Sequence, residues 1–242
     1  MKVLGLDAAT AVCGVAVVED ERLLCDYRLA VGPSHAEHLL VLVDRALKDL
    51  KLSLADLDGL ALTIGPGSFT GLRAAVSTVK GLVTAVHKPV AAISTLEAMA
   101  WNLPFARHPI CPLLDAKKKE VYAALFVFSE SGELKRLMED QVIAPGELLG
   151  RLSASGGGPT LFVGEGAFRY RDLIADQLGR QAQFVPVAHR GSMASVVAQL
   201  GLDRLKRGQR VDMDDLAPVY LRRPDAELNL EKQNAARENK KP

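Results

Sequence analysis

The stretch GLALTIGPGSFTGLRAAVSTVKGLVTAV, residues 59–86, carries the clearest fold signal in this sequence. Its apolar beginning, 59–64, predicts a buried strand, and the Gly65-Pro66-Gly67 run after it predicts a tight turn. Small and apolar residues then recur at helical spacing, which predicts a long helix from about Thr70 to Val86. A strand that passes through a turn directly into a helix is typical of an α/β fold.

Predicted elements extend on both sides of this stretch and occur in the same order twice. Each half of the chain contains three strands, then a helix, a strand, a helix, a strand and a final helix. Residue identities do not repeat, so the duplication rests on the order of elements alone. The elements lie at 3–7, 13–18, 22–29, 34–50, 59–64, 70–86, 90–93 and 95–102, and then at 109–114, 121–128, 136–143, 145–155, 161–163, 168–178, 184–187 and 192–207.

This order predicts an α/β protein with two lobes, each roughly βββαβαβα. Residues 1–105 form an N-terminal lobe that bears the partner-binding helices proposed below, and residues 106–221 form a smaller C-terminal lobe. Residues 222–242 are polar and lack an apolar stripe, so a disordered tail is expected. The last helix, 192–207, is equally compatible with packing back on the N-terminal lobe.

The charge balance restricts what the chain can bind. With 30 Lys and Arg against 29 Asp and Glu, the 242 residues carry a net charge of +1. This balance excludes the broad basic field of a protein that binds nucleic acid unaided, so any RNA contact must be local or supplied by a partner. Aromatic residues make up only 5% of the chain, which argues against a base-stacking platform.

The cysteine and hydropathy patterns point to a reducing compartment. Cys13, Cys25 and Cys111 form no CxxC pair and are too widely spaced for a disulfide framework or a zinc site. The longest apolar stretch, 121–128, has eight residues, against roughly 20 for a membrane-spanning helix. Asp7 interrupts the amino-terminal apolar run before a signal peptide forms. A cytoplasmic location without membrane contact is therefore expected.

The turn at 65–73, GPGSFTGLR, fails the templates of known phosphate loops. It lacks the Gly-Lys pair of a Walker A loop, and Thr70 stands where a Rossmann loop needs its third glycine. One interpretation is that the helix N-terminus binds an anion weakly, with Ser68 or Thr70 as cap and Arg73 in the first turn. The other, which we favour, is that the glycines only let the chain turn tightly from strand to helix and pack closely. The residues concerned are Gly65, Pro66, Gly67, Ser68, Phe69, Thr70, Gly71, Leu72 and Arg73.

The predicted helix at 70–86 has two contrasting faces. At about 100° per residue, one arc carries the core stripe. The opposite arc is small and uncharged where a solvent-facing side normally carries Lys or Glu. Small residues at this spacing let a second helix approach closely, so we expect another element to bury this face. The stripe consists of Leu72, Val76, Val79, Val83 and Val86, and the small face of Ala74, Thr78, Gly81 and Ala85.

The first predicted helix shows a related pattern. Ser34 is its candidate N-cap, with Glu37 three residues on, and its core stripe consists of Ala36, Leu39, Leu40, Val43, Leu47 and Leu50. Val41 and Leu42 lie off its core stripe beside His38 and Arg45, an arrangement typical of interface anchors. We predict that these four residues and the small face of the second helix form a partner interface. The alternative is that another segment of this chain, such as the last helix, covers both faces.

His35 and His38 are three residues apart with no third ligand in view, so a capping and surface role is favoured over a metal site.

Two βββαβαβα halves resemble the superfamily of actin, Hsp70 and the sugar kinases, in which ATP lies between two duplicated ribonuclease-H-like domains. Particular segments resemble the bacterial TsaB (YeaZ) family, and the resemblance covers nearly the whole chain except the tail. GPGSFTGLR after a strand is its most specific motif. The segments are LGLDAATAVCGV from residue 4, SHAEHLL from 34, GPGSFTGLRAAVSTVKGL from 65, ISTLEAMA from 93, DAKKKEVYAALF from 115 and APVYLR from 217.

The resemblance implies a role in tRNA modification without chemistry of its own. The TsaB family is the non-catalytic, activating partner of TsaD in making threonylcarbamoyladenosine beside the tRNA anticodon. Its first two helices pair with TsaD, or with a second copy when TsaD is absent. TsaD carries the metal and transfers the threonylcarbamoyl group, and TsaE, an ATPase, docks where the pair meets. By this resemblance the chain reaches tRNA only through the complex.

The phosphate hairpins of the superfamily are incomplete here. Active members use one strand hairpin per lobe, each beginning with Asp and containing Gly so that backbone N–H groups can approach the anion. The first hairpin offers Asp7 and Thr10 without Gly until Gly14, and the second offers Asp115, then Ala116 and three lysines. We interpret Asp7, Thr10 and Asp115 as vestigial. No tightly bound cofactor is expected, whereas weak nucleotide binding at a lobe or subunit interface stays open.

Other functions stay open as alternatives. The main one is an ATP-dependent kinase or carbamoyltransferase of the same superfamily, which the glycine-poor hairpins disfavour. A protease would need a nucleophile with a base, or a metal, and neither is evident. A freestanding RNA-binding module conflicts with the net charge. Lys117, Lys118 and Lys119, with Arg169 and Arg171, are either solvated surface or a guide for tRNA within the complex.

Overall fold

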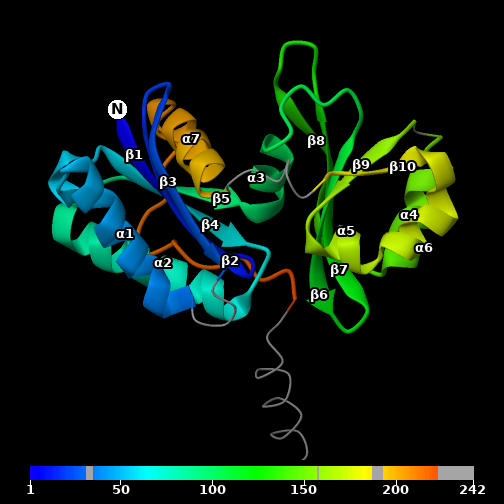
Figure 1. Cartoon of the computed structure of the whole chain (residues 1–242), viewed down its shortest axis with the longest axis horizontal. Coiled ribbons are helices and arrows are strands. Elements are labelled where there is room, and N and C mark those ends of the chain that lie inside the picture. Colours follow the sequence, from blue (N-terminus) through cyan, green and yellow to red (C-terminus); the bar gives the residue numbers. More distant parts are fainter. Residues whose placement is uncertain (31–34, 157, 187–192, 223–242) are drawn as a thin grey trace, which may run out of the picture.

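Two five-stranded sheets form the framework of the molecule (Figure 1). The computed structural model describes residues 1–30, 35–156, 158–186 and 193–222. The predicted cap at Ser34 and all of the predicted tail except Arg222 lie outside these described residues, as do the side chains of His35 and Glu37. The α/β fold class predicted from the sequence is confirmed.

The first sheet has the strand order β3-β2-β1-β4-β5. Strands β1, β2 and β3 are antiparallel neighbours, whereas β4 and β5 run parallel to β1. Three α-helices and a short 3-10 helix connect or follow these strands. The elements are β1 (Lys2–Asp7), β2 (Val12–Glu19), β3 (Arg22–Ala30), α1 (His35–Leu50), η1 (Leu54–Asp56), β4 (Gly59–Gly65), α2 (Phe69–Val86), β5 (Val90–Ser94) and α3 (Thr95–Trp101).

The second sheet repeats this arrangement with the order β8-β7-β6-β9-β10, in which β9 and β10 run parallel to β6. One predicted helix, 168–178, is in fact two short helices that meet at Tyr170. The elements are β6 (Ile110–Lys117), β7 (Glu120–Phe128), β8 (Leu134–Ile143), α4 (Pro145–Ala154), β9 (Thr160–Val163), α5 (Glu165–Arg169), α6 (Arg171–Leu178), η2 (Gly179–Gln181) and β10 (Ala182–Phe184).

The last helix, α7 (Met193–Lys206), packs on the first sheet although it follows the second in sequence. It lies on the face opposite α1 and α2 (Figure 1). Small residues permit this approach: a Cβ atom on Gly201 would lie 2.2 Å from the Cβ of Ala61, and one on Gly5 would lie 2.5 Å from the carbonyl oxygen of Ala194. The alternative in which α7 covers the outer faces of α1 and α2 is therefore wrong.

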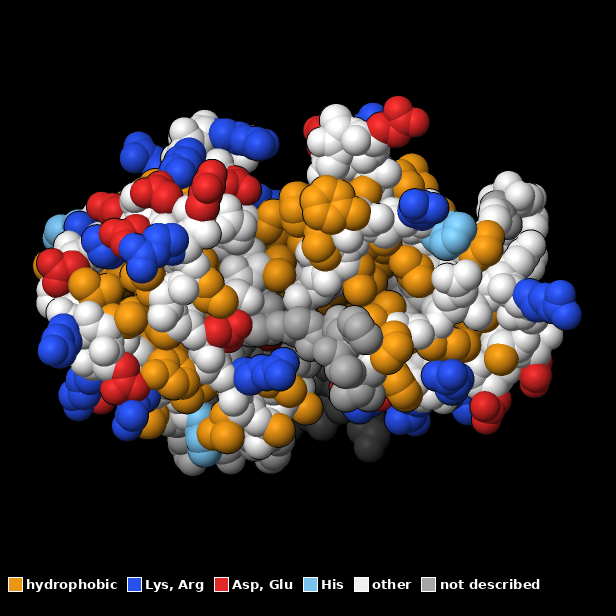
Figure 2. Space-filling model, turned by 45° about the horizontal axis from the view of Figure 1, so that its top comes forward, with side chains coloured by type: hydrophobic (Ala, Val, Ile, Leu, Met, Phe, Trp, Pro, Cys, Tyr) orange, Lys and Arg blue, Asp and Glu red, His pale blue; other side chains and the backbone are white. Residues whose placement is uncertain are grey.

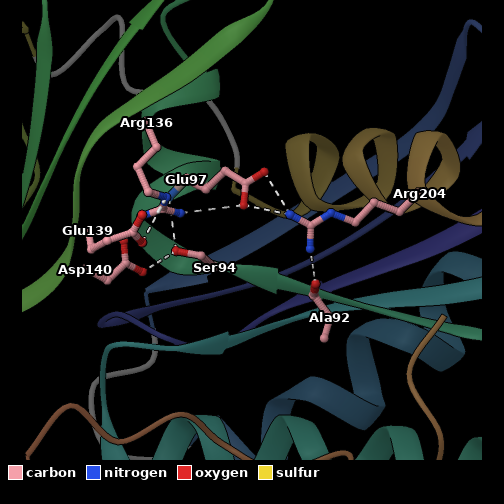
Figure 3. A network of polar contacts seen from close by, with 7 residues as sticks. All are labelled: Ala92, Ser94, Glu97, Arg136, Glu139, Asp140 and Arg204. Atoms are coloured by element: carbon pink, nitrogen blue, oxygen red, sulfur yellow. Dashed lines mark hydrogen bonds and ion pairs between the residues drawn. The ribbon is translucent and has the colours of Figure 1, made fainter. Parts of the chain in front are cut away.

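A network of ion pairs joins the two lobes beside α3 (Figure 3). Glu97 of α3 accepts two hydrogen bonds from the Arg204 guanidinium of α7, at 2.7 and 2.8 Å. Arg136 of β8 lies 4.0 Å from the same carboxylate and pairs with Asp140, which also accepts a 2.6 Å hydrogen bond from Ser94. The Glu97, Arg136 and Asp140 side chains are only 19, 25 and 17% exposed, so solvent screens this network weakly.

A second connection runs along residues 211–222, which we call the C-terminal strap. The strap begins at Val211, which bridges to β5, and the N–H of Val219 donates a 2.7 Å hydrogen bond to the carbonyl of Ile64. Arg222 then donates a 3.1 Å hydrogen bond to the carbonyl of Ala116 at the tip of the second sheet. The strap therefore ties both lobes together.

Two matched glycine substitutions test the packing of α7. Gly201→Ala should cost about 1–3 kcal/mol, because its new methyl group overlaps Ala61. Gly150→Ala in α4 meets no atom within 4 Å and should add about 0.5–1 kcal/mol through helix propensity. Thermal unfolding of both variants measures the difference. Equal stabilisation by the two substitutions would contradict the contact between α7 and the sheet.

Two matched arginine substitutions test the interlobe network. Arg136→Ala should lower the unfolding free energy by about 2–3 kcal/mol, because it leaves the largely buried Asp140 carboxylate without its cationic partner. Arg151→Ala removes an ion pair with Glu147 whose side chains are 55 and 56% exposed, and should cost under about 1 kcal/mol. Urea titration of both variants checks the prediction, and similar losses would show that the network contributes no more than a surface pair.

Candidate functional site

The glycine-rich turn between β4 and α2 packs against two other segments of the chain. At Gly65 the backbone φ is +125°, and a Cβ atom there would lie 2.5 Å from the carbonyl oxygen of Val219 in the strap. At Gly67 a Cβ atom would lie 2.3 Å from the carbonyl oxygen of Ala9, to which the Ser68 N–H donates a 2.7 Å hydrogen bond. The turn thus holds the β1–β2 hairpin and the strap in contact with the start of α2.

At the start of α2, the Ser68 hydroxyl is hydrogen-bonded within the helix. Ser68 is the N-cap, and its hydroxyl accepts a 3.3 Å hydrogen bond from the N–H of Gly71. Pro66 and Gly71 are buried, whereas Phe69, Thr70 and Arg73 are exposed. Of the two caps that the sequence allowed, the structure uses Ser68.

The two faces of α2 differ as its periodicity predicts. Leu72, Val76, Val79 and Val83 are buried in the core of the first lobe, and Val86 is only half-buried. Ala74 and Thr78 are half-buried, whereas Gly81 and Ala85 are exposed. A Cβ atom on Gly81 would meet nothing within 4 Å. The small face therefore lies on the surface of this chain.

The outward side of α1 carries apolar residues, but they are not the predicted pair. Val41 is 63% exposed, as predicted, whereas Leu42 is half-buried and packs against the core of the first lobe. Leu40, which we assigned to the core stripe, is 54% exposed. His38 is half-buried, and Arg45 is exposed and donates a 2.6 Å hydrogen bond to Asp49.

Together, these positions of α1 and α2 define what we call the outer helix face. The two helices pack side by side on one side of the first sheet (Figure 1). The face consists of His38, Leu40, Val41 and Arg45 of α1 and Ala74, Thr78, Gly81 and Ala85 of α2. It combines exposed branched side chains with positions where a helix backbone can approach closely.

The two hairpin aspartates are already engaged by the chain. Asp7 is 1% exposed, and its Oδ1 accepts hydrogen bonds from the Thr63 hydroxyl at 2.7 Å and the Ala9 N–H at 3.2 Å. Thr10, further along the same hairpin, bonds to the backbone of Val12. The structure therefore places Asp7 as a buried support of the hairpin.

Asp115 has a different environment from Asp7. Its carboxylate pairs with Lys117 at 3.0 Å and with Arg169 at 3.3 Å. Burial pushes the pKa of Asp115 upward, but the hydrogen bonds from Lys117 and the charges of Lys117 and Arg169 outweigh it and leave this pKa below its usual range. The carboxylate is thus ionised and neutralised by the chain's own cations.

A pocket of about 540 Å³ lies between the lobes. Asp7, Thr10 and Gly14 line it from the first lobe, and Leu114 and Glu165 from the second. Most of the remaining lining is apolar: Ala11, Val12, Leu29, Ala30, Met99, Val163, Met193 and Ala194, beside Gly164 and the polar Arg28 and Asn102. Asp115 is not among the lining residues, so this pocket contacts only one of the two hairpin aspartates.

The three cysteine thiols are poor nucleophiles. Burial raises the pKa of Cys13 and of Cys111 to about 12, and burial also raises the pKa of Cys25. These thiols therefore stay protonated at neutral pH.

Within the described ranges, no three His, Cys, Asp or Glu side chains are close enough together to hold a metal ion. The same ranges contain no helix both long and apolar enough to cross a membrane.

Charges of both signs alternate over the surface of the first lobe in Figure 2, where acidic and basic side chains lie next to one another. This face shows no broad field of one sign, in agreement with the net charge of +1.

Known proteins match both the sequence and the fold. The family model described as "TsaD: tRNA N6-adenosine threonylcarbamoyltransferase" matches residues 30–230. The tRNA threonylcarbamoyladenosine biosynthesis protein TsaB of Bacillus subtilis is 28% identical over 94% of this chain and 96% of its own length. YeaZ from Pseudomonas aeruginosa superposes with a TM-score of 0.77 at 26% identity, over 91% of this chain and 99% of that structure.

Two further matches are more limited, one to the fold and one to a short segment of the sequence. A ROK hexokinase from Thermus thermophilus, at 14% identity and a TM-score of 0.50 over 85% of this chain and all of its own, shares the fold alone. A tRNA N6-adenosine threonylcarbamoyltransferase of Maricaulis maris is 46% identical, but over only 28% of this chain and 18% of the transferase. Full-length agreement is thus with TsaB and YeaZ, and the chain belongs to the TsaB (YeaZ) family of tRNA threonylcarbamoyladenosine biosynthesis proteins.

Proposed function

We propose that this chain is the non-catalytic dimerisation and activating subunit of the tRNA threonylcarbamoyladenosine machinery, and that it binds TsaD through the outer helix face. The observation that carries this proposal is the surface position of the small face of α2, where Gly81 faces open space. Small residues let helices pack at interaxial distances of about 8 Å. Leu40 and Val41 supply the exposed apolar anchors beside it.

The mechanism that we propose is positional. α1 and α2 pair with two helices of TsaD, and the resulting interface stabilises a competent conformation of that subunit. TsaE docks where the pair meets, and tRNA is brought by the complex. The same face mediates a homodimer when TsaD is absent. We place this complex in the cytoplasm.

The environments of the candidate chemical groups support a catalytically silent subunit. Asp7 is hydrogen-bonded within its own hairpin, and Asp115 is neutralised by Lys117 and Arg169. The raised pKa values of the thiols leave no cysteine ionised at neutral pH. No residue of this chain needs to contact the reacting atoms in this role.

One observation favours the alternative, an ATP-dependent kinase or carbamoyltransferase. The interlobe pocket is large enough for a small molecule and has Asp7 in its wall. Its mainly apolar lining and the displacement of Asp115 from it argue against tight binding of a triphosphate. We therefore propose that no cofactor is tightly bound and that nucleotide binding at a lobe or subunit interface is weak.

A pair of arginine substitutions at open glycines tests the docking face. Gly81→Arg should abolish association with TsaD and self-association, because a long charged side chain keeps the helices apart. The monomer should stay folded, since the site is open and Arg favours a helix more than Gly does. Gly150→Arg in α4, which is equally open, should leave association unchanged. Sedimentation velocity of each variant, alone and with TsaD, decides the matter, and unchanged association of Gly81→Arg would refute the proposed interface.

Calorimetric titration of the isolated chain with ATP tests the enzymatic alternative. The expected result is a dissociation constant weaker than about 100 μM, because a single engaged aspartate and a glycine-poor hairpin cannot enclose a triphosphate. Binding at about 1 μM or tighter, with no association with TsaD, would favour the kinase or carbamoyltransferase.

A further inference from the structure

Basic side chains from four separate elements gather along one edge of the molecule, which we call the basic edge. It consists of Arg73 of α2, Lys117, Lys118 and Lys119 at the tip of the β6–β7 hairpin, Arg169 of α5 and Arg222 of the strap. In Figure 1 the hairpin, the end of the strap and the start of α2 lie along the lower edge of the molecule. No stretch of sequence contains this grouping.

One contact within α2 and two contacts between elements connect α2, the strap and the hairpin tip. The Arg73 guanidinium lies 5.0 Å from the centroid of the Phe69 ring, and that ring lies 5.1 Å from the ring of Tyr220. Two residues further along, Arg222 is hydrogen-bonded to the carbonyl of Ala116, immediately before the three lysines. The strap thus places the start of α2 next to the hairpin tip.

The basic edge has an excess of positive charge. Asp115, whose side chain is 6% exposed, pairs with both Lys117 and Arg169, so a single carboxylate faces two cations. Glu120 pairs with Arg222. Among the described residues, these two carboxylates pair with three of the six basic residues, Lys117, Arg169 and Arg222, although the whole chain is nearly neutral. A local attraction for a polyanion follows.

The hairpin presents its lysines at a cost in backbone energy. Lys117, Lys118 and Lys119 are exposed and have φ values of +61°, +49° and +65°. Lys117 pairs with Glu120, so Lys118 and Lys119 form a two-residue turn of the kind that favours Asn-Gly. A left-handed lysine costs about 1–2 kcal/mol relative to glycine. The chain therefore holds positive charge at a tip where uncharged residues would be more stable.

We infer that the basic edge contacts the phosphate backbone of tRNA within the assembled complex. This inference rests on the proposed function, because it needs a partner that brings tRNA to this chain. Arg73 immediately precedes Ala74 of the outer helix face, so RNA carried by a partner on that face can reach the basic edge. Phe69 and Tyr220, 40 and 38% exposed, add ring surface for an unpaired nucleotide beside the cations.

A turn replacement separates the charge of the tip from its folding. Lys118→Asn combined with Lys119→Gly removes two positive charges while installing the preferred Asn-Gly turn, so the hairpin should become more stable. The matched control combines Lys135→Gln in β8 with Lys51→Asn, which follows the end of α1, and both residues are exposed and lie outside the outer helix face and the basic edge. It also removes two charges and places Asn at a left-handed position, since Lys51 has a φ of +56°.

The readout is fluorescence anisotropy of a labelled, unmodified tRNA transcript between 50 and 200 mM salt, with the chain both alone and mixed with TsaD. For the hairpin variant in the complex, we expect a loss of affinity of about tenfold or more. The slope of log K against log salt should become shallower by about two, one for each lysine. The control variant should match the wild type in both quantities.

The possible outcomes distinguish this inference from the proposed function. If the hairpin variant still assembles with TsaD and binds tRNA with the affinity and salt slope of the control, the basic edge does not contact RNA and only this inference fails. If the wild-type chain does not assemble with TsaD, the proposed function fails. The isolated chain then decides the inference at 50 mM salt: weaker tRNA binding by the hairpin variant than by the control supports it, and equal binding overturns it.

Discussion

The rest of the structure depends on the close approach of the Gly65–Gly67 turn to the β1–β2 hairpin and the strap. The turn brings backbone against backbone at Ala9 and at Val219, where a side chain on either glycine would overlap a carbonyl oxygen. Because α2 begins directly after this turn, the contact sets the position of α2 on the first sheet. The outer helix face and the basic edge both contain residues of α2, so this one packing contact helps to position both proposed surfaces.

The two lobes of the duplicated fold differ in the surroundings of their hairpin aspartates. The two sheets share one topology, yet their hairpin aspartates have different surroundings: Asp7 is buried in a hydrogen-bonded support, and Asp115 is neutralised by two cations. The interlobe network around Glu97 and the strap connect the lobes at separate places. Such connections favour one relative orientation of the lobes, as the proposed docking role requires.

Sequence periodicity predicted the fold class and the small face of α2, but it did not assign every exposed residue. The predicted core stripe of α1 includes Leu40, but Leu40 and Leu42 each lie about 80° from the middle of the residues that the structure buries, Leu39, Val43, Ala46 and Leu47, so a helical projection cannot say which of the two is covered. The elements packed around α1 half-bury Leu42 and leave Leu40 exposed. The Glu97–Arg204 and Arg222–Ala116 contacts join residues more than 100 positions apart, and no local pattern signals them.

Hydrogen exchange of the chain with and without TsaD is the sharpest measurement of the proposed docking face, because it identifies which amides become protected. We expect the protection on mixing to be concentrated in α1 and α2, with the amides of α4 and α6 unchanged. Protection confined to the interlobe pocket or to the second lobe, with α1 and α2 exchanging as they do in the free chain, would contradict it.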